Sequence, residues 1–192
     1  MENSLLIRTD ATYSLNFLVY IQNIFLNQSQ QKEDLKFPYI PLKCMFHEDF
    51  EISYKKLWDE VSLKISENDL NDTKIFNREK DLFYQRLFVP SDDNLKDYTE
   101  IYRSFKIWWG SFAGRFLVER SIDEKLDKLY VELVNSLAQK RIEPQKMLSI
   151  SLIYDECLLV NLEALSYFVI LSTKDFFVKY KEIVPKLKVS IY

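Results

Sequence analysis

Glycine is nearly absent from this chain: of its 192 residues only two are glycine, Gly110 and Gly114. Soluble proteins average roughly 7% glycine, and glycine supplies the positive φ that many tight turns need. The chain therefore has little use for such turns, and Gly-rich phosphate-binding loops are excluded. Both glycines lie in one aromatic-rich heptapeptide, 108–114, where we expect either a close backbone approach or the end of a helix.

Helical periodicity dominates the rest of the sequence. The predicted fold is mainly α, a compact multi-helix bundle of about six helices with a minor β element near the C-terminus, in a single helical domain spanning 1–192. Hydrophobic content of 47% supplies a full core, and charged content of 29% is near the globular average.

Four segments carry expectations that a structure can test directly. A first helix is predicted over Ala11–Ser29, with Thr9 or Asp10 as its cap. The alternation in Leu148–Leu152 is typical of a strand, and the chain from Asp155 onward is predicted to be helical. The last six residues, 187–192, alternate cleanly and predict a short edge strand, which would pair readily with another chain.

On a helical wheel, the segment 98–118 has two different faces. One face is a core stripe of bulky residues: Tyr98, Ile101, Tyr102, Phe105, Trp108, Trp109, Phe112 and Phe116. The opposite face holds both glycines, with polar residues at its start and apolar residues at its end. The candidate interaction residues on this second face are Arg103, Ile107, Gly110, Gly114 and Leu117.

Three interpretations of the glycine pair stay open. In the first, another helix of the same domain crosses closely at Gly110 and Gly114. In the second, the helix breaks at Gly110, which adopts the left-handed conformation after a C-cap, and Ser111 caps a new helix. In the third, the glycine face is an exposed groove for a partner helix or a ligand. The first is favoured, and only the third is functional.

The inventory of reactive side chains excludes most catalytic sites. One histidine, His47, is too few for two- or three-histidine metal sites within the chain. Glu156 and Glu163, seven apart in the predicted last helix, are the remaining candidate metal ligands, as in all-helical hydrolases with acidic magnesium sites. No catalytic residue is assigned, and no cofactor is expected.

Charge and cysteine content indicate which partners and which cellular location to expect. The net charge is −3, and no Lys/Arg cluster is unbroken by acids, so direct nucleic-acid binding is not expected. Two distant cysteines indicate no disulfide scaffold, the amino terminus does not resemble a signal peptide, and no apolar window is long enough for a membrane span. A cytoplasmic location without membrane contact is the resulting expectation.

These observations favour a non-enzymatic protein that binds another protein. Its role would be that of a subunit, adaptor, inhibitor or immunity-type partner, of bacterial or phage origin, and a homo-oligomer is one form that this interaction could take. The support is the aromatic excess of 15% and the second face of segment 98–118, because Tyr, Trp and Phe are enriched in interface cores. The alternative is a helical enzyme or ligand-binding regulator with an acidic divalent-metal site at Glu156 and Glu163.

Overall fold

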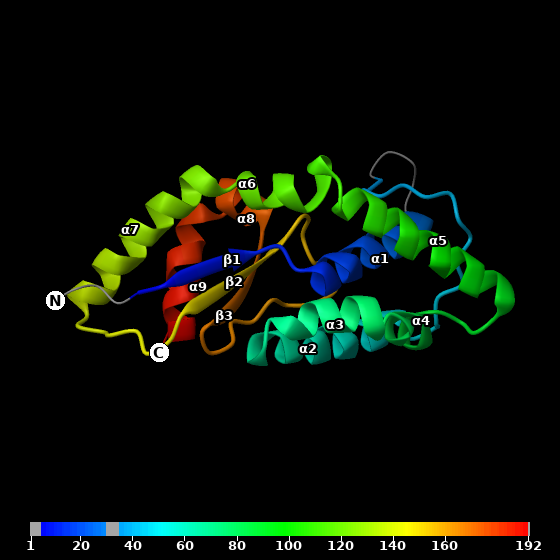
Figure 1. Cartoon of the computed structure of the whole chain (residues 1–192), viewed down its shortest axis with the longest axis horizontal. Coiled ribbons are helices and arrows are strands. Elements are labelled where there is room, and N and C mark those ends of the chain that lie inside the picture. Colours follow the sequence, from blue (N-terminus) through cyan, green and yellow to red (C-terminus); the bar gives the residue numbers. More distant parts are fainter. Residues whose placement is uncertain (1–4, 30–34, 192) are drawn as a thin grey trace. The chain divides into compact units, whose positions relative to one another are not determined.

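The computed structural model describes residues 5–29 and 35–191. Within them the chain is mainly helical and carries a three-stranded parallel sheet, two strands of which lie near the C-terminus, so the predicted fold class is confirmed. The chain divides into two compact units, drawn in Figure 1. The strand unit comprises Met1–Thr12, Phe112–Glu156 and Leu162–Tyr192, and the helical unit comprises Tyr13–Ser111 and Cys157–Asn161. Whether the chain folds as a single domain stays a prediction.

The strand unit is built on a sheet in which β2 (Leu148–Ile153) lies between β1 (Ile7–Asp10) and β3 (Phe168–Ser172) (Figure 1). The three strands are parallel, and Asp10 at the end of β1 lies opposite Ser151. β2 and β3 are buried along almost their whole length. The continuous apolar run of β3 is typical of a parallel strand that is covered on both faces, whereas β2 alternates apolar residues with Ser149 and Ser151.

Helices of the strand unit pack around this sheet. In α7 (Asp123–Gln139) the buried residues Leu129, Leu133 and Leu137 recur every four positions, so they form one apolar face. α7 packs against α9 (Tyr180–Ile191), which also contacts β3. The remaining elements of this unit are η1 (Phe112–Phe116), α6 (Leu117–Arg120) and α8 (Thr173–Val178).

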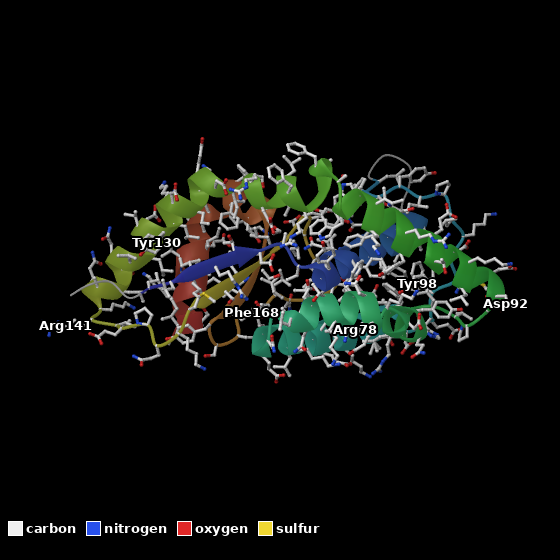
Figure 2. The ribbon with its side chains drawn as sticks, viewed as in Figure 1. Arg78, Asp92, Tyr98, Tyr130, Arg141 and Phe168 are labelled. Carbon is white, nitrogen blue, oxygen red and sulfur yellow. The ribbon has the colours of Figure 1, made fainter. Side chains whose placement is uncertain are left out.

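The helical unit is centred on α1 (Tyr13–Ser29), which contacts the second, third and fifth helices. Phe17 of α1 is fully buried, and its ring centroid lies 5.1 Å from those of Phe83 and Phe105. Tyr98, labelled in Figure 2, contacts the same ring. The aromatic excess of the sequence is therefore largely core. The other helices of the unit are α2 (Phe50–Glu67), α3 (Leu70–Arg78), α4 (Asp81–Leu87) and α5 (Asp92–Trp109).

The N-terminus of α1 is capped by a residue distant in sequence. Asp72 of α3 accepts hydrogen bonds from the backbone N–H groups of Tyr13 and Ser14, both at 2.7 Å. The prediction that Thr9 or Asp10 caps this helix is wrong, because both residues belong to β1. A local pattern could not identify a cap that comes from another helix.

Two predictions for the C-terminal third are also wrong. The segment 187–192 was expected as a strand, yet α9 continues to Ile191, and Tyr192 lies outside the described residues. Ile183, Leu187 and Ile191 of α9 are buried at a spacing of four, which is typical of a helix. The same part of the chain also alternates over 187–192, so the alternation did not exclude a helix. The helix expected from Asp155 is instead irregular chain followed by β3, whereas the predicted strand over Leu148–Leu152 is confirmed as part of β2.

A buried glutamine explains the irregular chain after β2. Gln22 of α1 accepts hydrogen bonds through Oε1 from the backbone N–H groups of Leu158 and Leu159, at 2.7 and 3.2 Å. These contacts attach segment 157–161 to the helical unit. The apolar run that followed Asp155 in the sequence therefore divides between a loop held by a side chain and a buried strand, and periodicity alone does not distinguish such a run from a buried helix.

Candidate functional site

The candidate interaction residues do not share one helix. Arg103 and Ile107 lie on α5, Gly114 lies in η1, and Leu117 begins α6. Because Ser111 belongs to the helical unit and Phe112 to the strand unit, these residues are divided between two units. Ile107 is 75% exposed and Leu117 is 50% exposed, whereas Gly114 is buried.

α5 ends at Trp109, and this break overturns part of the helical wheel. Through Trp109 the core stripe is largely correct: Tyr98, Ile101, Phe105 and Trp109 are buried, and Tyr102 and Trp108 are half-buried. Beyond the break the phase of the helix is lost. Phe112 and Phe116, expected in the core, are instead 73% and 47% exposed. The predicted core face is therefore correct only for the part of the segment that precedes Gly110.

At Gly110 the structure agrees with one part of the second interpretation, the end of the helix. It caps the C-terminus of α5, but with φ −79° and ψ −7°, so the expected left-handed conformation is wrong. Ser111 donates a hydrogen bond through Oγ to the carbonyl oxygen of Trp108 at 2.6 Å instead of capping a following helix. A Cβ at Gly110 would lie 3.1 Å from the carbonyl oxygen of Lys106, which belongs to the same helix, so the close approach there is not made by a crossing helix.

The break exposes a small apolar surface on the strand unit, which we name the aromatic patch: Phe112, Phe116 and Leu117. The two phenylalanine rings contact each other, with centroids 4.8 Å apart and planes inclined by 34°. The guanidinium of Arg120 lies 5.8 Å from the centroid of Phe116, within the range of a cation–π contact. An aromatic pair with a cation at its edge is a composition typical of protein interfaces.

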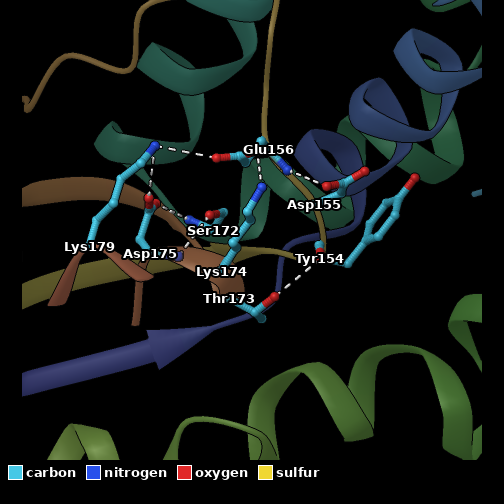
Figure 3. Close-up of polar contacts among 8 residues, drawn as sticks. All are labelled: Tyr154, Asp155, Glu156, Ser172, Thr173, Lys174, Asp175 and Lys179. Atoms are coloured by element: carbon cyan, nitrogen blue, oxygen red, sulfur yellow. Dashed lines mark hydrogen bonds and ion pairs between the residues drawn. The ribbon is translucent and has the colours of Figure 1, made fainter. Parts of the chain in front are cut away.

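Glu156 and Glu163, the second candidate set, do not lie on one helix, contrary to the prediction. Glu163 lies in irregular chain between β2 and β3. Glu156 makes ion pairs through both oxygens, with Lys174 Nζ at 2.7 Å and Lys179 Nζ at 3.3 Å (Figure 3). The hydrogen bond from Lys174 lowers the pKa of Glu156 below its ordinary value, and Lys179 acts in the same direction. A metal ion would have to displace two ammonium groups from this carboxylate.

Sequence reasoning missed a cluster at the carboxyl end of β1, which we name the carboxyl-end cluster: Asp10, Arg115 and Glu119. Arg115 donates hydrogen bonds to Asp10 Oδ1 at 2.6 Å and to Glu119 Oε1 at 2.9 Å. Burial raises the pKa of Asp10, and the neighbouring Glu119 raises it further against the opposing charge of Arg115. The cluster thus holds two carboxyl groups and one guanidinium at the end of a parallel strand.

Buried hydroxyl groups adjoin this end of the sheet. Thr12 Oγ1 and Ser151 Oγ lie 3.0 Å apart and are separated by 139 residues in the chain. No local pattern indicates this contact, because it depends on the pairing of β1 with β2. The one signal in the sequence is Asp10, three residues after the short apolar stretch 5–7, where the pattern predicts a helix cap.

The described ranges contain no group of three or more His, Cys, Asp or Glu side chains placed to hold a metal ion. Across the same ranges, no helix has the length and apolar character needed to cross a bilayer. Comparison of the chain with protein-family models, with curated proteins and with solved structures found no match.

Proposed function

We propose that this protein acts by binding another protein through the aromatic patch. The observation that carries the proposal is the exposure of two phenylalanine rings, Phe112 at 73% and Phe116 at 47%, which contact each other on the surface. Single exposed apolar side chains are ordinary, but a contiguous apolar group next to polar residues marks an interaction site.

The exposed parts of the two phenylalanine rings carry an unfavourable free energy of hydration. Full burial of such a side chain is worth roughly 1.5–3 kcal/mol, and Phe112 and Phe116, which are 73% and 47% exposed, each forgo a corresponding part of it. A partner that covers Phe112, Phe116 and the adjacent Leu117 recovers this energy, and hot spots of interfaces are rich in such aromatic anchors. Arg120 and Asp123, joined by an ion pair at 3.1 Å, supply a polar boundary.

The test compares two variants as tagged baits. In the first, Phe112→Ser and Phe116→Ser remove the aromatic patch. In the second, Phe177→Ser alters an equally apolar, 58% exposed residue on α8 and serves as the matched control. A partner that is retained by the unaltered chain and by the control, but lost with the patch variant, supports the proposal.

Sedimentation of the purified chain tests a second copy as the partner. If the unaltered chain and the control variant self-associate and the patch variant does not, the partner is a second copy of the chain. That result also supports the proposal. Retention of every partner and of the oligomeric state by the patch variant would refute the proposal, provided its circular dichroism matches that of the unaltered chain.

A second candidate function is favoured by the carboxyl-end cluster. In open parallel sheets, ligands bind outside the carboxyl ends of the strands, where this cluster lies. Mg²⁺ is commonly held by one or two carboxylates together with substrate phosphates, and Arg recognises phosphate through paired donors. Asp10 and Glu119 would hold the ion after it displaced the guanidinium of Arg115, which donates to both carboxylates in the unliganded chain, and Arg115 would then contact the phosphate. The alternative from the sequence, an acidic divalent-metal site, is therefore proposed here rather than at Glu156 and Glu163.

Thermal unfolding with MgCl₂, with and without sodium phosphate, tests this candidate. We expect a saturable rise in the unfolding midpoint that Asp10→Asn and Glu119→Gln abolish and that Glu163→Gln leaves unchanged. Loss of the rise with Glu163→Gln alone would instead indicate a metal site at Glu156 and Glu163. Absence of any rise in the unaltered chain would remove this candidate.

A further inference from the structure

The segment of the strand unit that carries the aromatic patch has two faces with different chemistry. On one face, both phenylalanine rings of the patch and the side chain of Leu117 are exposed to solvent. On the other face, Arg115 and Glu119 are half-buried and form an ion pair at 2.9 Å. The surface that a partner would cover and the charges that contact the sheet therefore belong to one short stretch of chain, 112–120.

The backbone of this stretch does not by itself fix the position of the first ring. η1 is a single π-turn, and within it Gly114 has φ −94° and ψ −122°, which is outside the helical range. Regular helix begins again only at Leu117, the first residue of α6, so Phe112 is not held in place by that helix. Gly114 and Val118 are the buried residues of η1 and α6, and neither supplies a large apolar side chain to the core. Polar side-chain contacts are therefore the available means of fixing the turn.

These polar contacts lead from the turn to the end of β1. Arg115 Nη2 donates to Asp10 Oδ1 at 2.6 Å, and Arg115 Nε donates to Glu119 Oε1 at 2.9 Å. The same Oε1 atom accepts from the backbone N–H of Ala11 at 3.2 Å. Asp10 is paired in register with Ser151 of the buried strand β2, so the turn is attached to a fixed part of the sheet. Because the donors of a guanidinium point in fixed directions, contact with two carboxylates also restricts how the turn can rotate.

We propose that Arg115 is the positioning residue of the aromatic patch. By contacting Asp10 and Glu119 together, its guanidinium holds η1 so that the two phenylalanine rings of the patch contact each other on the surface. The inference rests on the proposed function, because it names the residue that prepares that surface for its partner. A surface already held in its binding conformation loses less conformational freedom when the partner binds, and therefore binds more tightly.

The first measurement uses the full chain without any partner. In a chain with ¹³C-labelled phenylalanine rings, NMR cross-peaks report the contact between Phe112 and Phe116, whose centroids are 4.8 Å apart. We expect Arg115→Ala to abolish this cross-peak, and Arg115→Lys, which keeps a positive charge beside the carboxylates, to restore part of it. Lys128→Ala is the matched control, because it breaks an exposed ion pair with Glu132 on α7, at 3.7 Å, and should leave the cross-peak unchanged.

The second measurement is the affinity for the protein that the tagged, unaltered chain retains, or for a second copy of the chain. Arg115→Ala should weaken this binding about fivefold, the size expected when ion pairs that are more than half-buried are lost. Arg115→Lys should weaken it less, and Lys128→Ala should not weaken it. A change of this kind with both rings still present separates positioning of the patch from direct contact by its phenylalanines.

The cross-peak decides whether the inference stands. Its retention in a folded Arg115→Ala variant would overturn the inference, as would its equal loss in Lys128→Ala. If Arg115→Ala does not fold, Asp10→Asn takes its place, since it removes one of the two ion pairs of Arg115: a weakened cross-peak supports the inference, and an unchanged one overturns it. The proposed function fails by a different result, the retention of every partner by the patch variant, so the two failures are distinguishable.

Discussion

Removing the carboxylate that caps α1 should destabilise the helical unit by about 3 kcal/mol. Asp72 is 5% exposed and accepts two backbone N–H groups, from Tyr13 and Ser14, at 2.7 Å each. A hydrogen bond to a charged group contributes roughly 1.5–3 kcal/mol, and a buried donor left without an acceptor costs about 1–3 kcal/mol. Asp72→Ala loses both bonds, whereas Asp72→Asn keeps one acceptor oxygen, so we expect about half the loss from the amide.

Urea unfolding followed by tryptophan fluorescence measures this effect, because Trp58, Trp108 and Trp109 are the three tryptophans of the chain and all lie in the helical unit. At a slope of about 2 kcal/mol per M, a loss of about 3 kcal/mol moves the midpoint by about 1.5 M. Asp59→Ala, at an exposed position of α2, is the matched control.

The order of stability should be unaltered chain, then Asp72→Asn, then Asp72→Ala. If Asp72→Ala unfolds within about 0.5 kcal/mol of the unaltered chain, or if Asp59→Ala costs as much, the capping argument is wrong. An equal loss from the amide and the alanine variant would show that the charge, and not the number of hydrogen bonds, determines the effect.

Three further predictions concern the core and the two charged clusters. Phe17→Ala should cost about 3–5 kcal/mol and Phe17→Leu about 1–2 kcal/mol in the same urea assay, and equal costs would contradict an aromatic core. The raised pKa of Asp10 means that its stabilising contribution is complete below the unfolded value of 3.8 and is lost as the pH rises. Asp10→Asn should therefore raise the unfolding midpoint at pH 7 but not at pH 3, and a lowered midpoint at pH 7 would refute this sign. Glu156→Gln should cost at most about 1 kcal/mol at pH 7, because its two ion pairs are largely exposed and contribute only above the lowered pKa; a larger loss in thermal unfolding would indicate a structural role.

The success of sequence reasoning depended on how local each feature was. The buried face of α5 could be predicted up to Trp109, because a helical face depends on residues three and four apart. Phe112 and Phe116 were misplaced as soon as the helix broke, since every later position depends on the phase of the earlier ones. The carboxyl-end cluster was invisible for a different reason: Arg115 reaches Asp10 across 105 residues of chain.

The scarcity of glycine, the helical periodicity and the single histidine are properties of the sequence by itself, and they determined a mainly helical chain without a phosphate loop or a multi-histidine metal site. Only the tertiary structure decided that β1 pairs with β2, that α1 is capped from α3, and that the chain through Ile191 is a helix and not a strand. The physical reason is that secondary-structure patterns report contacts within a few residues, whereas strand pairing and capping by distant side chains depend on contacts that form only when the whole chain has folded.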